Sequence, residues 1–149
     1  METAISKTTT DVLNKQLADW NVLLVKLHNY HWNVKGPHFF TLHAKFEELY
    51  NEATIHIDNL AERILILGDK PIATMREYLD ASGIKEGNNY TKPNDMVRDL
   101  VSNYSYFIEE LKNGMVIAEQ DNDSVTHDLL LAISEQLAKH IWMLKAFLG

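Results

Sequence analysis

Apolar residues recur along most of this chain at alternating intervals of three and four positions. That spacing places side chains on one face of an α-helix. Four long segments follow it, and their apolar positions run from Leu13 to Val34, from Phe39 to Leu67, from Val97 to Ala118 and from Leu130 to Leu148. We therefore predict four amphipathic helices. Strand patterns are weak throughout.

Capping and helix-breaking residues mark where these helices begin and end. In chain order they are Thr10 or Asp11 and Gly36-Pro37 for the first helix, Gly68 and Pro71 after the second, Pro93 before the third, and Asp123 or Ser124 before the fourth. These boundaries leave two short connections and one long one.

The short connections predict that helices one and two, and helices three and four, are antiparallel neighbours. The long connection covers about residues 68 to 93 and contains "ATMREYLDASG", a short helix that we expect Gly83 to close. Four helices with one long crossover are typical of the ferritin-like four-helix bundle. We predict an all-α fold in one domain over residues 1–149, with a flexible N-terminal tail of about ten residues.

The composition excludes some kinds of site and some kinds of partner. The chain has no cysteine, which excludes disulfides, thiolate chemistry and iron–sulfur clusters. Its net charge of −7 repels nucleic acid and anionic membranes and attracts cations. No apolar run approaches the roughly 20 residues that span a bilayer, and no secretory signal is visible, so we expect a cytoplasmic protein.

Two histidines, His31 and His43, stand on the apolar stripes of neighbouring helices. The simplest interpretation of one such histidine is a core side chain satisfied by a hydrogen bond. Here Glu47 lies one turn beyond His43, at i,i+4, so both side chains reach one ion. The combination favours a metal site.

The second helix carries another pair at the same spacing, Asp58 and Glu62. At about 100° per residue, Glu47, Asp58 and Glu62 lie roughly 40°, 60° and 100° around the helix axis from His43. All four side chains therefore line one flank. This flank overlaps the apolar stripe, where unpaired acids are costly.

The two pairs of the second helix cannot meet within one chain. His43 and Asp58 are fifteen positions apart, which is about 22 Å along a helix axis. Two copies of the helix, antiparallel across a twofold axis near residues 52–53, bring the first pair of one copy to the second pair of the other. An isologous interface repeats the contact, so each dimer would hold two identical sites.

A missing motif supports this arrangement. Ferritin-like bundles that hold a di-iron centre within one chain use two Glu-x-x-His motifs and two further glutamates. No Glu-x-x-His occurs in this sequence, so a metal in such a fold must sit elsewhere. Two imidazoles and three carboxylates without sulfur suit iron, manganese or zinc.

The stretch "HNYHWNVKGPHFFTLHAKFEELY", followed by "HIDNLAERI", resembles the Dps family of mini-ferritins. The resemblance also covers "GDKPIATMREYL" and the ending "KHIWMLKAFL", and so spans essentially the whole chain. It implies a hollow homo-dodecamer that oxidises Fe(II), preferably with hydrogen peroxide rather than dioxygen, and stores a ferric oxide core.

The resemblance also implies a ligand set for two irons at each intersubunit centre. His31, His43 and Glu47 of one chain would face Asp58 and Glu62 of another. Several family members have aspartate in place of this glutamate, so direct and water-mediated binding by Glu47 both remain open.

For several other residues we predict a functional role and keep a structural alternative. Trp32, next to His31, is expected to intercept stray oxidising equivalents, with packing as the alternative, and Trp142 resembles a second family tryptophan. Asp121 and Asp128 are expected to line pores that admit Fe(II), with helix capping as the alternative. The remaining histidines are expected to pack or face solvent, with His28 also a candidate for contact near the metal; they are His28, His38, His56, His127 and His140.

Two other functions compete with an iron-oxidising enzyme. One is a nucleoid-binding protein with incidental metal affinity. DNA binding in the family usually depends on a lysine-rich tail, whereas only Lys7 precedes the first helix here, so we do not expect direct DNA binding. The other is a helical bundle whose histidines merely pack.

Overall fold

Five α-helices make up the part of the chain that the computed structural model describes, residues 7–87 and 92–149. They are α1 (Thr9–Asn33), α2 (Phe39–Ile66), α3 (Met75–Ala81), α4 (Pro93–Gln120) and α5 (Ser124–Leu148). The predicted all-α fold, its four long helices and the short helix in the crossover are confirmed. Most of the predicted N-terminal tail, residues 1–6, lies outside the described part.

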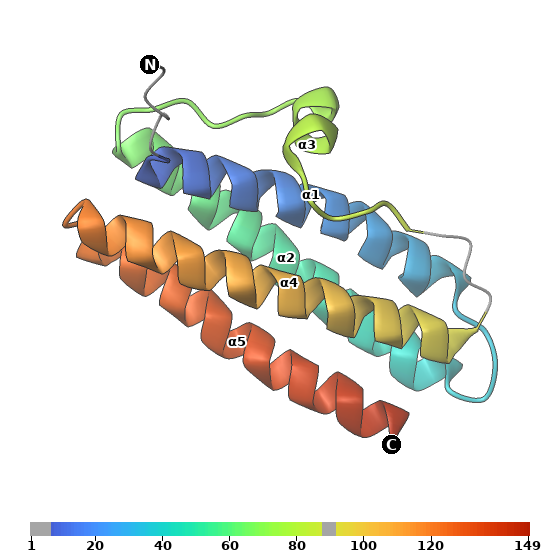
Figure 1. Cartoon of the computed structure of the whole chain (residues 1–149). Helices are drawn as coiled ribbons and strands as arrows, with labels where there is room; N and C mark the ends of the chain where they lie inside the picture. Colours follow the sequence, from blue (N-terminus) through green and yellow to red (C-terminus); the bar gives the residue numbers. More distant parts are fainter. Residues whose placement is uncertain (1–6, 88–91) are drawn as a thin grey trace, which may run out of the picture.

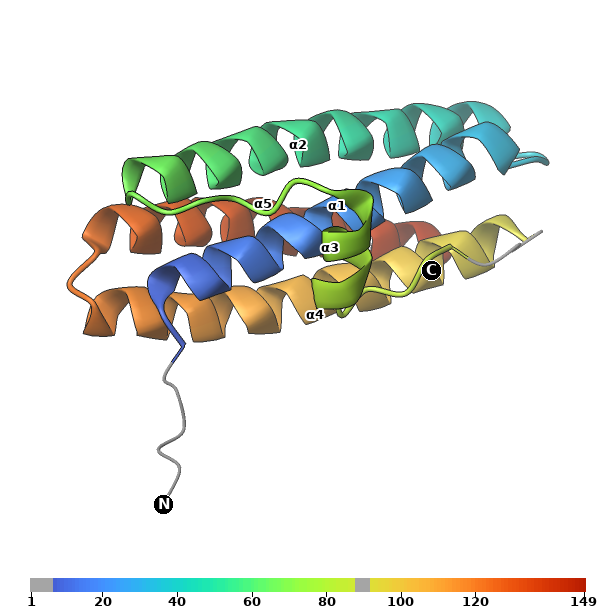
Figure 2. The ribbon, with the colours of Figure 1, turned by 90° about the horizontal axis from the view of Figure 1, so that it is seen from above.

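The four long helices form a bundle of two antiparallel pairs, α1 with α2 and α4 with α5 (Figure 1). The crossover returns along the length of the bundle, so α2 and α4 run in the same direction. Figure 2 shows α3 lying over α1 on the outside of the bundle. The fold therefore leaves the short α1–α2 turn at one end and the α4–α5 turn at the other.

Large apolar side chains fill the space between the four helices. Trp20, Tyr104 and Phe107 are fully buried, and the rings of Trp20 and Phe107 lie 4.3 Å apart. The indole of Trp20 donates to Gln16 Oε1 at 3.2 Å, which satisfies the polar edge of a buried ring. None of the helices in residues 7–87 and 92–149 is long and apolar enough to cross a lipid bilayer.

The cap of α1 differs from both predicted candidates. Thr8 is the N-cap: its hydroxyl accepts from the Asp11 amide at 3.1 Å, while Asp11 Oδ2 accepts from the Thr8 amide at 3.0 Å. This reciprocal capping box makes Asp11 the third helical residue. The expectation of Thr10 or Asp11 was wrong because three threonines in a row offer several caps, and Asp11 pairs best with the first.

The segment after α3 is fastened by a buried carboxylate. Asp19, fully buried on α1, accepts from the Ser82 hydroxyl at 2.7 Å and from the Gly83 amide at 2.8 Å. It also accepts from Lys15 Nζ at 3.0 Å and from the Tyr106 hydroxyl at 3.1 Å. Four donors satisfy a charge that burial alone would make costly.

Gly83 does not close α3 in the way that was predicted. Ser82 is the C-cap and has an extended backbone, and Gly83 is not among the residues with positive φ. A Cβ on Gly83 would instead lie 2.3 Å from the Tyr106 hydroxyl oxygen. The glycine is required by a close approach to α4, not by a left-handed cap.

Candidate metal centre

Two histidine rings face each other beside the α1–α2 turn. His31 lies in the last turn of α1 and His43 in the second turn of α2. Their rings stack with centroids 3.7 Å apart and planes 13° apart. His31 Nδ1 is 2.7 Å from the backbone oxygen of His43, and His43 Nδ1 is 2.7 Å from the backbone oxygen of His31. Each ring is therefore oriented by the other residue's backbone.

These hydrogen bonds fix which nitrogen of each ring is free. A carbonyl oxygen only accepts, so Nδ1 donates in both His31 and His43 and carries the hydrogen. The lone pair of each neutral ring is then on Nε2. Histidines that bind metals are oriented in this way, with one nitrogen donating to a carbonyl or carboxylate and the other left for the ion.

Tyr50 connects this histidine pair to Glu47. Its ring stands edge-on to His31, with centroids 5.2 Å apart and planes 83° apart, and its hydroxyl donates to Glu47 Oε1 at 3.2 Å. Burial raises the pKa of Tyr50, and the hydrogen bond to Glu47 raises it further, so the phenol keeps its proton. Sequence reasoning missed Tyr50, although its i,i+3 spacing from Glu47 was a usable signal.

An exposed tryptophan continues this aromatic group. His28 lies 4.4 Å from the Tyr50 ring and stacks on Trp32 with centroids 5.3 Å apart. Trp32 is 70% exposed and therefore does not serve the core of the chain. The Tyr50 ring therefore contacts both His28 and His31.

Asp58 and Glu62 lie on the exposed side of α2, toward its C-terminal end. A hydrogen bond to Asp58 raises the pKa of Glu62, and the charge of Asp58 raises it further. Two neighbouring carboxylates repel each other, and a bound cation relieves that repulsion.

The two halves of the predicted site remain apart in one chain. Because α2 is continuous from Phe39 to Ile66, the fifteen positions between His43 and Asp58 correspond to about 22 Å. Within residues 7–87 and 92–149, no three histidine or acidic side chains of one chain lie close enough together to hold an ion. The five-residue ligand set shared by two chains stays a prediction.

The acids of the α4–α5 turn are placed differently from one another. Asp121 Oδ2 accepts from the Thr9 hydroxyl at 2.5 Å and so joins the end of α4 to the start of α1. Asp123 caps α5 by accepting from the Thr126 amide at 3.0 Å, and it pairs with Arg63 at 2.9 Å. The cap expected at Asp123 is confirmed. Asp128 is exposed, 3.3 Å from the neighbouring His127.

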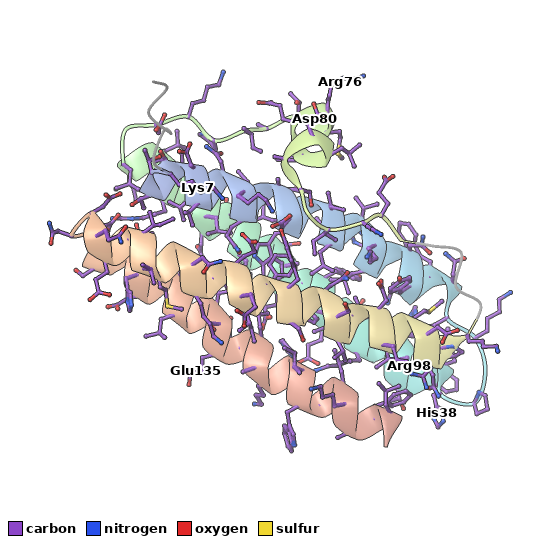
Figure 3. The ribbon with its side chains drawn as sticks, in the orientation of Figure 1. Lys7, His38, Arg76, Asp80, Arg98 and Glu135 are labelled. Atoms are coloured by element: carbon purple, nitrogen blue, oxygen red, sulfur yellow. The ribbon has the colours of Figure 1, made fainter. Side chains whose placement is uncertain are left out.

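The remaining histidines do not join the site. Figure 3 shows His38 at the α1–α2 turn, where it is exposed. His140 and His56 are buried in the bundle and share Glu52: His140 Nε2 is 2.9 Å and His56 Nε2 is 3.5 Å from the same carboxylate oxygen. Partial burial alone would raise the pKa of Glu52, but the hydrogen bond from His140 and the nearby ring of His56 lower it to about 2. Sequence reasoning missed this group of three side chains, because Glu52 is not one of the regularly spaced apolar positions of the second helix.

Comparisons with known proteins agree with this architecture. A sequence model of the ferritin-like domain matches residues 10–149. The chain is 55% identical over 145 residues to "DNA protection during starvation protein 2" of Bacillus anthracis, covering 97% of this chain and 99% of that protein. It is 52% identical to "General stress protein 20U" of Bacillus subtilis, covering 97% and 100%.

Solved structures also match this chain over nearly its full length. A crystal structure of a Dps protein from Bacillus brevis superposes with a TM-score of 0.95 at 49% identity, and each chain is covered completely. Dps from Staphylococcus aureus superposes with a TM-score of 0.93 at 42% identity, over 97% of this chain and 99% of that one.

Proposed function

This chain belongs to the Dps family of ferritin-like proteins, and on that premise we propose that it is a ferroxidase and iron store. It oxidises Fe(II), preferably with hydrogen peroxide, at a centre shared by two subunits. The observation that carries the proposal is the reciprocal bonding of His31 and His43, which leaves two Nε2 lone pairs for a metal. A merely structural histidine pair needs no such free nitrogens.

The donor set fits iron. Two neutral imidazoles and the carboxylates of Glu47, Asp58 and Glu62 offer nitrogen and oxygen ligands without sulfur, a set that suits Fe(II). A cation held by Asp58 and Glu62 would relieve the repulsion between their two carboxylates. Two Fe(II) ions are the substrates of each centre. One electron from each reduces hydrogen peroxide, which with two protons becomes two waters, so no hydroxyl radical is released.

The exposed apolar side chains support assembly with further copies. Val25, Met75 and Leu79 are 53%, 68% and 52% exposed, and they line a groove between α1 and α3. Apolar surface of this kind marks an interaction site on a soluble protein. We propose a homo-dodecamer that encloses the ferric product. In that shell Asp121 and Asp128 would line entry pores, and Trp32 would absorb stray oxidising equivalents.

Subunit mixing tests the shared centre directly. One variant, His31→Ala/His43→Ala, removes the imidazoles, and the other, Asp58→Ala/Glu62→Ala, removes the carboxylates. In a twofold dimer of one chain of each kind, one centre has both defects and the other is intact. Random mixing by joint refolding should therefore restore about a quarter of the wild-type rate of peroxide-dependent iron oxidation, although each variant alone is inactive.

The mixing experiment has clear alternatives. If all five ligands acted within one chain, no mixture would regain activity, and the shared centre would be wrong. If either double variant alone kept the full rate, its residues would not be the ligands. Glu109→Gln/Glu135→Gln, which removes two exposed acids outside the site, is the matched control and should keep the wild-type rate.

A further inference from the structure

Tyr50 touches residues from both helices that build the proposed centre. Its ring lies 4.4 Å from His28 and 5.2 Å from His31, both on α1. Its hydroxyl donates at 3.2 Å to Glu47 Oε1, one turn earlier on α2. The tyrosine therefore links the position of α1 to the carboxylate of Glu47.

The two partners of that hydrogen bond differ in freedom. The ring of Tyr50 is partly buried, packs against the bundle core and is held between two α1 histidines, so its hydroxyl has little room to move. Glu47 is exposed. Without a partner its flexible side chain would sample several rotamers, and ordering it on metal binding would be unfavourable.

We propose that Tyr50 is a positioning residue for the metal ligand Glu47. Its hydroxyl donates to Oε1, which leaves Oε2 as the oxygen available to bind a metal. Glu47 is then a direct ligand through one oxygen, which answers the question that its longer side chain raised. This inference rests on the proposed function, because it assigns a role within the same centre.

Loss of the hydrogen bond between Tyr50 and Glu47 should weaken metal binding measurably. Carboxylates that bind metals are usually hydrogen-bonded through the oxygen that does not bind, and losing that partner weakens metal binding. Tyr50→Phe removes only the hydroxyl and keeps the ring between the histidines. We expect metal affinity to fall by about tenfold, the lower end of the range for such partners.

The experiment compares wild-type protein with Tyr50→Phe in anaerobic titrations with Fe(II) and with Co(II), read by calorimetry. Peroxide-dependent oxidation is then followed over a range of iron concentrations. The iron concentration for half-maximal rate should rise about as much as the affinity falls, while the rate at saturating iron stays within about twofold. Tyr104→Phe is the control, because that buried hydroxyl has no hydrogen-bond partner among the described residues, and it should change neither quantity.

A double-mutant cycle separates positioning from a general structural effect. In a Glu47→Ala background the hydroxyl has no acceptor to hold, so Tyr50→Phe should lower the metal affinity no further. An equal loss in both backgrounds would overturn the inference, as would unchanged affinity in Tyr50→Phe. Wild-type protein that neither bound nor oxidised iron would instead overturn the proposed function.

Discussion

His31 and His43 are linked by two reciprocal hydrogen bonds: the Nδ1 atom of each ring lies 2.7 Å from the backbone oxygen of the other residue. The bond pair joins the last turn of α1 to the second turn of α2, across a connection that contains Gly36 and Pro37. Both acceptors are backbone oxygens, so each ring keeps its hydrogen bond when the other side chain is replaced. The two side chains depend on each other directly only through their stacking, and as proposed ligands of one centre.

That interdependence predicts a non-additive effect. His31→Ala removes one proposed ligand and the ring that stacks on His43, although His43 Nδ1 keeps its acceptor, the backbone oxygen of residue 31. We expect the affinity for Fe(II) or Co(II) to fall more than about tenfold, and His31→Ala/His43→Ala to be little worse than either single variant. Calorimetric titration measures this, with His38→Ala as the control. Fully additive losses would mean that the two rings act separately.

The dependence of stability on acid pH should report the half-buried Glu52. Its pKa, lowered from 4.5 to about 2 by His140 and His56, means that the folded protein binds this proton less readily than the unfolded chain. The stability from this group is therefore present above about pH 4.5 and is lost as the pH falls from there toward 2.

Glu52→Gln should remove that pH dependence. We expect the variant to lose about 2 kcal/mol of unfolding free energy at pH 7, after allowance for solvent screening, and to lose less than wild type on acidification. Urea unfolding at a series of pH values measures both effects. Glu109→Gln, an exposed acid, should follow the wild-type curve; identical curves for Glu52→Gln would contradict the prediction.

The close approach at Gly83 predicts a compensating pair. Gly83→Ala places a Cβ 2.3 Å from the hydroxyl oxygen and 2.9 Å from Cζ of Tyr106, so the tyrosine side chain or the crossover must shift, at a cost of about 1–3 kcal/mol. Tyr106→Phe removes the closer of these two atoms. In the Tyr106→Phe background the alanine should cost less than in wild type. Thermal unfolding of the four proteins completes the cycle, and an equal cost in both backgrounds would show that the hydroxyl contact is not the source of that cost.

DNA should not bind directly. The relatives' names speak of DNA protection, but the net charge of this chain is −7, and Lys7 is the only lysine before α1. Under the proposed function, removal of iron and peroxide would protect DNA without contact. A gel-shift assay at low salt and neutral pH should show no retarded band. A band that disappears as salt is added would instead favour the nucleoid-binding alternative.

Periodicity explains why the fold could be predicted. The alternation of three and four positions describes a helix face directly, and the difference in connection lengths orders the helices. The true cap, Thr8, was missed because neighbouring threonines are chemically equivalent in sequence. The reason for Gly83 was missed because Tyr106, the side chain that excludes a Cβ there, is twenty-three positions away and on another helix.

The site could be predicted only in part for the same physical reason. Residue spacing places Glu47 near His43 and separates both from Asp58, since a continuous helix converts sequence into distance. Contacts between helices have no such rule. The stacking of His31 on His43 and the hydroxyl of Tyr50 beside Glu47 depend on how α1 packs on α2, and no local pattern encodes that packing.

The continuity of α2 has one more consequence for the proposed enzyme. Because α2 is continuous, it keeps the His43 and Glu47 half of the proposed centre about 22 Å from the Asp58 and Glu62 half, so a newly made chain would carry two half-centres and no whole one. Oxidation would begin only after subunits have met, and ferric ions would form only where a shell is ready to enclose them. Dilution that separates the subunits should therefore abolish iron oxidation while the single chains are still folded.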